Sequence, residues 1–266
     1  ILENGMVGIK ARQYYAKEDS MPRCSIIFDA PKILNTGLIV EDDYYRIKSH
    51  IKRALGLVYG DENLFYNHNL VRIDYRYDIK VTDASTRSLY LYLYNKTRKQ
   101  YRRLKKYGLE NYRTSIYHQS KTIEVILYSK NEECEAKGRT PEEWEQDVMR
   151  FEVRLRNSHL YNQTKKTGEI KCLFNFFKKD KFEKYVQNYL LKIYPSGDFY
   201  DFNSALNLIR QSDYSLTIKN RLNEFLRNVA NGTLDTPVNT TYSKSISKDT
   251  WRKRINLFNT IDVNPI

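Results

Sequence analysis

A tyrosine and a lysine stand two residues apart at the end of an apolar segment, at Tyr128 and Lys130. In a β-strand these two side chains would lie on the same face. Tyrosine attacks phosphorus as the phenolate, and a phenol with a pKa of about 10 is only about a thousandth ionised at pH 7. A nearby ammonium group lowers that pKa. The spacing therefore suits a tyrosine nucleophile, although packing of an amphipathic tyrosine is the simpler interpretation in a chain with 23 Tyr.

Two acids, Asp74 and Glu152, lie in the middle of segments whose alternation predicts β-strands, where acids are disfavoured. Carboxylates suit hard divalent cations such as Mg²⁺ or Mn²⁺, and such a cation neutralises a phosphodiester during cleavage. Glu124 is a weaker third candidate. The alternative is a ladder of exposed ion pairs, each worth about 0–1 kcal/mol, because arginines flank both acids on the same predicted faces: Arg72, Arg76, Arg150 and Arg154.

Basic side chains gather at the end of a helix that is expected to begin after Asp83 and to continue to about residue 106. Such a run would follow the phosphates of a nucleic acid, and a merely solvated helix face is the alternative. Near the C-terminus, Ser247 is placed to cap a helix-turn-helix recognition element that contains Trp251, unless Trp251 belongs to a core. The candidate DNA-binding residues are Lys96, Arg98, Lys99, Arg102, Arg103, Lys105, Lys106, Arg154, Arg252 and Arg254.

The composition favours a polyanionic partner. With 45 Lys and Arg against 32 Asp and Glu, the 266-residue chain has a formal charge of +13. Tyrosines interleaved with cations suit single-stranded nucleic acid, because bases stack on the rings while cations follow the phosphates. No apolar run is long enough to span a bilayer, so nucleic acid ranks ahead of a membrane surface. Three scattered cysteines predict a reducing compartment such as the cytoplasm. The missing initial Met predicts either a trimmed chain or one part of a longer protein.

Periodicity predicts mostly strands early in the chain and only helices toward its end. The expected strands are 23–30 (followed by a turn at Pro31 and Lys32), 70–81, 112–118 and 121–128 (as a hairpin), and 148–156. The expected helices are 41–55, 84–106, 142–146, 181–193, 202–211, 217–230 and one that starts at 247. This order predicts an α+β fold, with an antiparallel sheet flanked by helices over 1–197 and a small all-helical domain over 198–266.

Six short segments, taken together and in order, resemble motifs of one family. They are a strand with a Pro-Lys-hydrophobic turn at 25–35, Arg-Ile-Asp at 72–74, Thr-Ser-Ile-Tyr at 114–117, Leu-Tyr-Ser-Lys at 127–130, Met-Arg-Phe-Glu-Val-Arg-Leu at 149–155, and a Ser-x-x-Thr-aromatic-Arg helix opening at 247–252. In this register the chain resembles the rolling-circle replication initiators of filamentous phages and related plasmids, the gene II/X type of site-specific nicking endonuclease.

The resemblance implies an enzyme that nicks one strand of a double-stranded origin, stays attached through a 5′-phosphotyrosine and later religates the displaced strand. It places the family's nucleophile on Tyr128, its lysine on Lys130 and its acids on Asp74 and Glu152, with Mg²⁺ or Mn²⁺ as the cofactor. Origin DNA and host replication proteins such as a helicase are the implied partners, in the cytoplasm of a bacterial host. The related relaxases bind their metal through a His-hydrophobic-His pair. The four histidines of this chain form no such pair, because none lies two residues from another.

Three alternatives remain. Tyr185 and Tyr189, four residues apart on one helix face, resemble the paired-tyrosine helix of other phage initiators, whereas packing of this helix onto the sheet is the simpler interpretation. A non-enzymatic DNA-binding regulator of replication or transcription would use the same basic surfaces and would keep its acids in structural ion pairs. An RNA-binding or RNA-processing protein would prefer substrates that carry 2′-hydroxyl groups.

Overall fold

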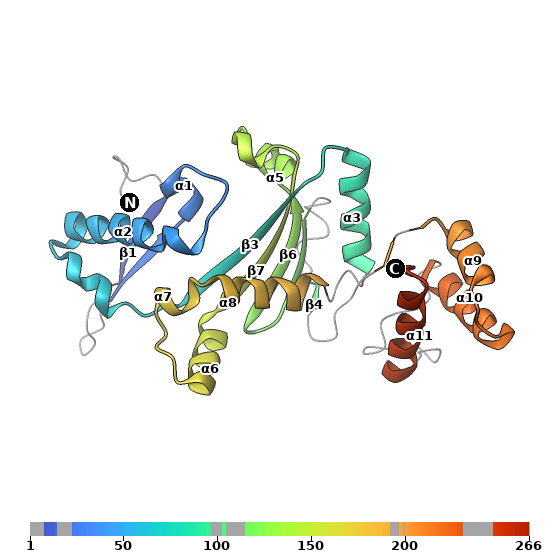
Figure 1. The fold of residues 1–266 in the computed structure, drawn as a ribbon. Helices are drawn as coiled ribbons and strands as arrows, with labels where there is room; N and C mark the ends of the chain where they lie inside the picture. Colours follow the sequence, from blue (N-terminus) through green and yellow to red (C-terminus); the bar gives the residue numbers. More distant parts are fainter. Residues whose placement is uncertain are drawn as a thin grey trace. The chain divides into compact units, whose positions relative to one another are not determined.

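The structure of the chain is a computed structural model that describes residues 8–14, 23–96, 103–104, 115–191, 197–198, 200–230 and 247–265. Within these residues, helices combine with antiparallel sheets and the C-terminal part is helical, which confirms the predicted α+β class (Figure 1). The chain divides into two compact units, which are described one at a time. Unit 1 comprises Ile1–Ile73, Glu142–Glu145 and Arg156–Glu183, and unit 2 comprises Asp74–Pro141, Gln146–Leu155 and Lys184–Ile266.

Unit 1 contains an antiparallel hairpin and several helices. The hairpin strands are β1 (Ile9–Tyr14) and β2 (Arg23–Phe28). The helical elements are α1 (Ala30–Leu34), η1 (Glu41–Asp43), α2 (Tyr44–Tyr59), η2 (Glu62–Asn67), η3 (Glu143–Glu145), α6 (Asn157–Thr167), α7 (Leu173–Phe176) and the start of α8 (Lys179–Val186). Helix α2 directs its apolar face into a core formed by Leu34, Tyr44, Ile47, Ile51, Leu55, Phe65 and Leu173.

Two expectations for unit 1 need correction. Pro31 and Lys32 lie inside helix α1 rather than in a turn, because proline is well tolerated in the first turn of a helix, where its missing N–H would have no partner. Helix α2 continues beyond the expected end at residue 55 and stops at Gly60, which adopts a left-handed conformation with φ of 73°.

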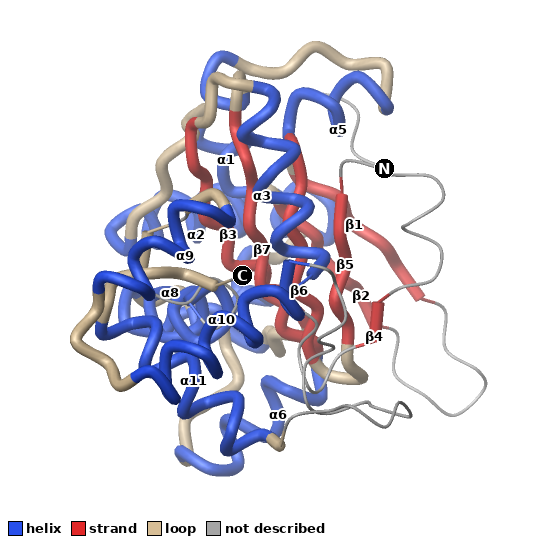
Figure 2. Tube along the Cα trace, turned by 90° about the vertical axis from the view of Figure 1, so that its right-hand side faces the viewer, coloured by secondary structure: helices blue, strands red, loops and turns tan. Residues whose placement is uncertain are grey.

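Unit 2 is organised by a five-stranded sheet in the order β3-β7-β6-β5-β4. The strands are β3 (Arg72–Lys80), β4 (Arg103–Leu104), β5 (Ser115–Gln119), β6 (Ile123–Ser129) and β7 (Val148–Arg156), drawn in red in Figure 2. The predicted hairpin is confirmed, since β5 and β6 pair in antiparallel fashion, and β7 has the predicted bounds. Strands β6 and β7 lie in the middle of the sheet, and nearly all their residues are buried.

One face of this sheet is apolar and packs against helices. Helix α3 (Ala84–Lys96) contacts β5 and β6, and the ring of Tyr94 meets His118 edge-on. Helix α8 continues into a π-helix (Gln187–Leu191).

The Asp83 side chain accepts a hydrogen bond from the backbone of Thr86 at the start of α3, as expected of an N-cap. The expected continuation of this helix to residue 106 is wrong, because residues 103–104 form β4 and pair with β5.

The C-terminal helices of unit 2 share a core of their own. They are α9 (Phe202–Gln211), α10 (Leu216–Ala230) and α11 (Lys248–Thr260), and their buried residues, among them Phe225 and Phe258, form one apolar cluster. Asp201 caps α9 and Ser247 caps α11 through side-chain hydrogen bonds to backbone N–H groups. The domain boundary at residue 197 stays a prediction. In the described ranges, no helix combines the length and the apolar character needed to cross a membrane.

Candidate active site

The second face of the five-stranded sheet carries polar side chains from three neighbouring strands. In the β6–β7 ladder, Tyr128 lies opposite Arg150 and Glu124 lies opposite Arg154. Because side chains alternate between faces, the even-numbered residues of β6 and β7 share one face. Arg150 and Arg154 of β7 form ion pairs with Asp78 and Asp74 of β3, so the even-numbered residues of β3 lie on this face too. We call these residues the polar cluster: Asp74, Arg76, Asp78, Glu124, Tyr128, Arg150, Glu152 and Arg154.

Tyr128 and Glu152 form the central hydrogen bond of the polar cluster. The hydroxyl group of Tyr128 donates to Oε1 of Glu152 over 2.6 Å. The two residues are diagonal neighbours on adjacent strands, because the direct partner of Glu152 in the ladder is Ile126. Tyr128 is 7% exposed and Glu152 is 8% exposed. The structure therefore brings together the predicted nucleophile and one of the two predicted acids.

Arg154 holds the other side of Glu152 and links it to two more acids. Its Nη2 and Nε atoms donate to Oε2 of Glu152 at 2.7 and 3.0 Å. Nη1 of the same guanidinium donates to Glu124 at 3.4 Å, and Nε lies 3.4 Å from Oδ2 of Asp74. One guanidinium group thus compensates three carboxylates from three strands, which fixes the orientation of Glu152 toward Tyr128.

The electrostatics of this pair differ from the expectation for an activated phenol. Burial, and then the charge of Glu152, raise the pKa of Tyr128 above its ordinary value. Burial would also raise the pKa of Glu152, but the charge of Arg154 and the hydrogen bond from Tyr128 hold it below its ordinary value. The expected lowering of the phenol pKa is therefore wrong for the arrangement described. The proton lies on Tyr128, and ionised Glu152 is its acceptor.

Lys130 lies near Tyr128 for a different reason from the one the spacing suggested. Strand β6 ends at Ser129 and Lys130 starts helix α5 (Lys130–Ala136), so the alternation argument does not apply to it. Its Nζ atom nevertheless lies 5.9 Å from the centroid of the Tyr128 ring. The same atom donates a 2.7 Å hydrogen bond to Glu133, one turn further along α5. The ammonium group is thus close to the phenol and is also paired with an acid.

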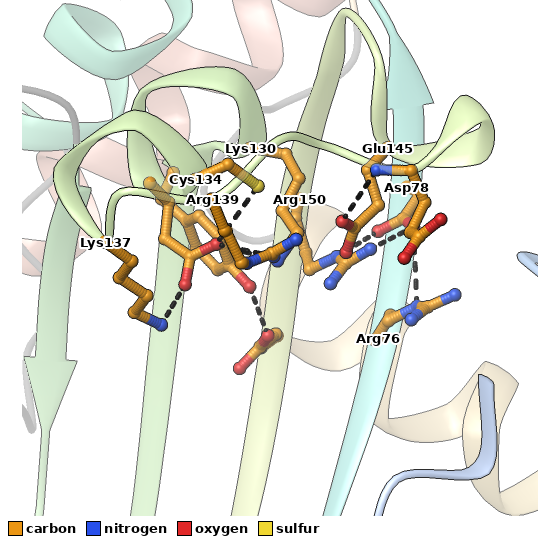
Figure 3. A network of polar contacts seen from close by, with 12 residues as sticks. Arg76, Asp78, Lys130, Cys134, Lys137, Arg139, Glu145 and Arg150 are labelled. Carbon is orange, nitrogen blue, oxygen red and sulfur yellow. Dashed lines mark hydrogen bonds and ion pairs between the residues drawn. The ribbon is translucent and has the colours of Figure 1, made fainter. Parts of the chain in front are cut away.

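Glu133 is the centre of a second group of ionic contacts, because Lys130, Lys137 and Arg139 all pair with its carboxylate. These three basic residues are labelled in Figure 3. Burial opposes ionisation of this carboxyl, but hydrogen bonds from Lys130 and Lys137 lower its pKa to about 2. Because the folded pKa lies below the unfolded value of 4.5, ionised Glu133 stabilises the fold above about pH 4.5, and this contribution is lost as the pH falls toward 2.

We therefore expect the Glu133→Gln variant to be less stable than the wild type at neutral pH. After allowance for solvent screening, the loss is about 1–2 kcal/mol. The difference between the two proteins should shrink as the pH is lowered from 5 to 2, and thermal unfolding across that range measures it. An unchanged difference at every pH would show that the Glu133 carboxylate is not the source of the effect.

Arg150 of β7 and Asp78 of β3 form a bidentate ion pair within the polar cluster. Nε and Nη2 of Arg150 bind the two oxygens of Asp78 at 2.8 and 2.9 Å, and Nε of Arg76 lies 3.3 Å from the same carboxylate (Figure 3). The charge of Arg150 opposes part of the rise in the pKa of Tyr128. Sequence reasoning did not single out Asp78 or Glu133. Alternation already placed Asp78 on the face of Asp74, but only the strand register shows its partner.

The predicted metal ligands Asp74 and Glu152 do converge, but a side chain lies between them. Both carboxylates bind the guanidinium of Arg154, which takes the place that a cation bridging them would need. Among the residues that the structure describes, no group of three or more His, Cys, Asp and Glu is arranged to hold a metal ion. In this arrangement the two acids do not fit a divalent ion unless Arg154 moves.

The expected DNA-binding run falls mostly outside the described residues. Lys96 ends helix α3 and Arg103 lies in β4. Arg154 was predicted to contact DNA, whereas its guanidinium is committed to carboxylates of the polar cluster. The remaining members of the run lie outside the part of the chain that the structure describes: Arg98, Lys99, Arg102, Lys105 and Lys106.

The predicted C-terminal DNA contacts lie on helix α11. Arg252 forms an ion pair with Asp249, and the guanidinium carbon of Arg254 lies 5.5 Å from the ring centroid of Phe225. Trp251 packs against the helical core, with its ring centroid 4.9 Å from that of Phe225. The helix cap at Ser247 is as predicted, and the half-buried Trp251 agrees with the alternative that placed it in a core.

The two tyrosines considered as alternative nucleophiles, Tyr185 and Tyr189, form a stack that packs onto the sheet. Tyr185 is buried and its ring stacks on Tyr75 of β3, with centroids 5.5 Å apart. Tyr189 stacks in turn on Tyr185, with centroids 6.4 Å apart. Burial, and then the neighbouring Tyr189, raise the pKa of Tyr185 to about 12. These contacts agree with the packing interpretation of the pair.

Comparisons with protein families, with curated proteins and with solved structures found no match to this chain.

Proposed function

We propose that the chain is a rolling-circle replication initiator that nicks and religates one strand of origin DNA, with Tyr128 as the nucleophile. The observation that carries the proposal is the 2.6 Å hydrogen bond from the Tyr128 hydroxyl to Glu152. A nucleophile with a proton acceptor in hydrogen-bond reach is what attack by a phenol requires. The resemblance of β3, β6 and β7 to motifs of nicking endonucleases points to a phosphodiester as the substrate. Host replication proteins such as a helicase, in a bacterial cytoplasm, would be its partners.

In the proposed reaction, the Tyr128 oxygen attacks phosphorus and the bond from phosphorus to the 3′ oxygen breaks. The phenolic proton passes to Oε1 of Glu152 and then to the departing 3′ oxygen. The products are a 5′-phosphotyrosyl protein and a free 3′-hydroxyl that primes synthesis, and the reverse reaction rejoins a strand. Because the phenol pKa is raised and the Glu152 pKa is lowered, proton transfer has to accompany the attack rather than precede it.

Cations around the phenol support this chemistry. Nζ of Lys130 lies 5.9 Å from the Tyr128 ring, and the charge of Arg150 acts on the phenol directly. Both would lower the cost of bringing a phosphate to Tyr128. The resemblance also implies Mg²⁺ or Mn²⁺ at Asp74 and Glu152. Because Arg154 lies between these acids, the proposed reaction includes no step at a cation. The nicking assay in Mn²⁺, Mg²⁺ and EDTA shows whether a cation is required.

A specific observation favours a second function, a non-enzymatic DNA-binding regulator. The acids of the polar cluster are paired with arginines, and the phenol pKa is raised rather than lowered. A purely structural network would have these properties too. The two functions differ in one respect, since only the initiator forms a covalent bond to DNA.

The test uses supercoiled plasmid that carries the origin of the element encoding the chain, together with a pool of random-sequence single-stranded DNA. Each is incubated with the protein in Mn²⁺, in Mg²⁺ or in EDTA, and the products are separated in detergent with and without protease. We expect nicked circles and a detergent-stable protein–DNA adduct. DNA that is bound in a gel-shift assay but yields no adduct in any condition would favour the regulator.

A further inference from the structure

An aromatic and basic surface lies in unit 1, on helix α2 and the adjoining η2. We call it the Tyr66 surface, and it consists of Tyr45, Lys48 and Lys52 of α2 and Tyr66 of η2. The three α2 residues are spaced three and four apart and therefore share one helix face. Element η2 packs on α2 through buried Phe65, and the next residue along the chain, Tyr66, faces solvent.

Two lysines are held against the ring of Tyr66. Nζ of Lys48 lies 4.9 Å and Nζ of Lys52 lies 5.2 Å from its centroid, which is the geometry of a cation–π contact. Lys48 also lies 5.7 Å from the ring of Phe65. One acid is near, since Glu62 lies 3.8 Å from Lys52. The two ammonium groups are thus grouped at one aromatic ring rather than spread over the surface.

The pKa of Tyr66 reflects a positive electrostatic potential at the Tyr66 surface. The charge of Lys48, and then that of Lys52, lower the pKa of Tyr66 below its ordinary value. The effect is opposite to that on Tyr128, whose pKa is raised by burial and by an acid. A negatively charged group brought to the Tyr66 surface would therefore be attracted to it.

The packing of unit 1 does not account for the exposure of the Tyr66 and Tyr45 rings. Tyr66 is 60% exposed and Tyr45 is 67% exposed, so neither ring buries much of its apolar surface in unit 1. Surfaces that bind single-stranded nucleic acid combine exposed aromatic rings with cationic groups. The bases stack on the rings, and the phosphates are attracted to the cations. The formal charge of +13 adds a general attraction for such a polyanion.

We propose that the Tyr66 surface binds single-stranded nucleic acid, with a base stacked on Tyr66, phosphates at Lys48 and Lys52, and Tyr45 as a second stacking ring. The proposal goes beyond the nicking reaction, because the Tyr66 surface lies in unit 1 whereas Tyr128 lies in unit 2. Binding at the Tyr66 surface requires no covalent chemistry, so it can be tested separately.

The test measures the fluorescence anisotropy of labelled oligothymidylate with the full chain, over a range of salt concentrations. We expect Tyr66→Ala to weaken binding roughly five- to hundredfold and Tyr66→Phe to bind nearly as the wild type, because the ring rather than the hydroxyl stacks. The Lys48→Gln/Lys52→Gln variant should bind more weakly and lower the slope of log K against log salt by about 1.4, the value for two lost phosphate contacts.

The matched control is Tyr161→Ala, which removes a tyrosine that is 57% exposed on helix α6. It should bind as the wild type. Wild-type affinity in both Tyr66→Ala and the double lysine variant would overturn the proposal. So would binding to phosphatidylserine vesicles that these variants lose while their affinity for oligonucleotides is unchanged. Parallel titrations with oligouridylate and with duplex DNA compare the affinities for RNA, for single-stranded DNA and for the duplex. Preference for the duplex would contradict the proposal.

Discussion

Replacing Tyr128 with phenylalanine is expected to abolish the covalent adduct with DNA and to lower the nicking rate at least about a thousandfold. The substitution removes only the hydroxyl group, which is both the proposed nucleophile and the donor to Glu152. It also leaves a buried carboxylate oxygen with one donor fewer, so we expect a loss of about 1–3 kcal/mol in stability. Nicking rates and adduct yields, measured well below the melting temperature of the variant, separate the two effects.

The matched control is Tyr185→Phe. Tyr185 is a buried tyrosine of unit 2 that stacks on Tyr75 and lies outside the polar cluster. This variant should nick at close to the wild-type rate. The opposite pattern, with Tyr128→Phe active and Tyr185→Phe inactive, would move the nucleophile to the paired tyrosines of the α8 region.

Replacing Arg154 with alanine is expected to destabilise the protein by about 3 kcal/mol or more at neutral pH. The reason is that Asp74, Glu124 and Glu152 would lose the guanidinium that compensates all three of them, and removal of one partner of a buried ion pair leaves uncompensated charge. Denaturant unfolding at neutral pH measures this loss.

The pH dependence of the Arg154→Ala variant has a defined sign. Without Arg154, burial should raise the pKa of Glu152, so the folded variant would bind protons more readily than the unfolded one. Its stability should then recover as the pH falls toward the ordinary carboxyl pKa of 4.5, while the wild type loses stability as Glu152 protonates below that value.

A matched control for Arg154 is available in the same cluster. Arg76→Ala should destabilise the protein less than Arg154→Ala does, because Asp78 keeps its two hydrogen bonds to Arg150. Equal losses for Arg76→Ala and Arg154→Ala, with the same dependence on pH, would mean that Arg154 has no special role in compensating the three acids.

The fold was predictable wherever local periodicity and capping agreed. Strand β7 and helix α9 have the predicted bounds, and the caps at Asp83 and Ser247 form as expected. Short elements without periodicity were missed, among them β1, α5 and α7. The helix expected to reach residue 106 was wrong because pairing of β4 with β5, a contact distant in sequence, replaces it.

The candidate site was predictable as a set of residues but not as a set of contacts. Alternation along β3 and β7 placed Asp74 and Glu152 on faces with arginines, and the structure confirms that alternation. Which arginine binds which acid depends on strand register, and no local pattern encodes it. The direction of the pKa shift of Tyr128 depends on burial and on Glu152, 24 residues away in sequence, so the spacing to Lys130 alone predicted the wrong sign.

The most direct test of the central claim is to locate the tyrosine that becomes attached to DNA. The protein is reacted with origin DNA, digested with protease and nuclease, and the nucleotide-bearing peptide is sequenced by mass spectrometry. We expect a 5′-phosphonucleotide on Tyr128 in wild-type protein and none in Tyr128→Phe. A nucleotide on any other residue, or strand cleavage that leaves every peptide unmodified, would contradict the assignment of the Tyr128–Glu152 pair as the active site.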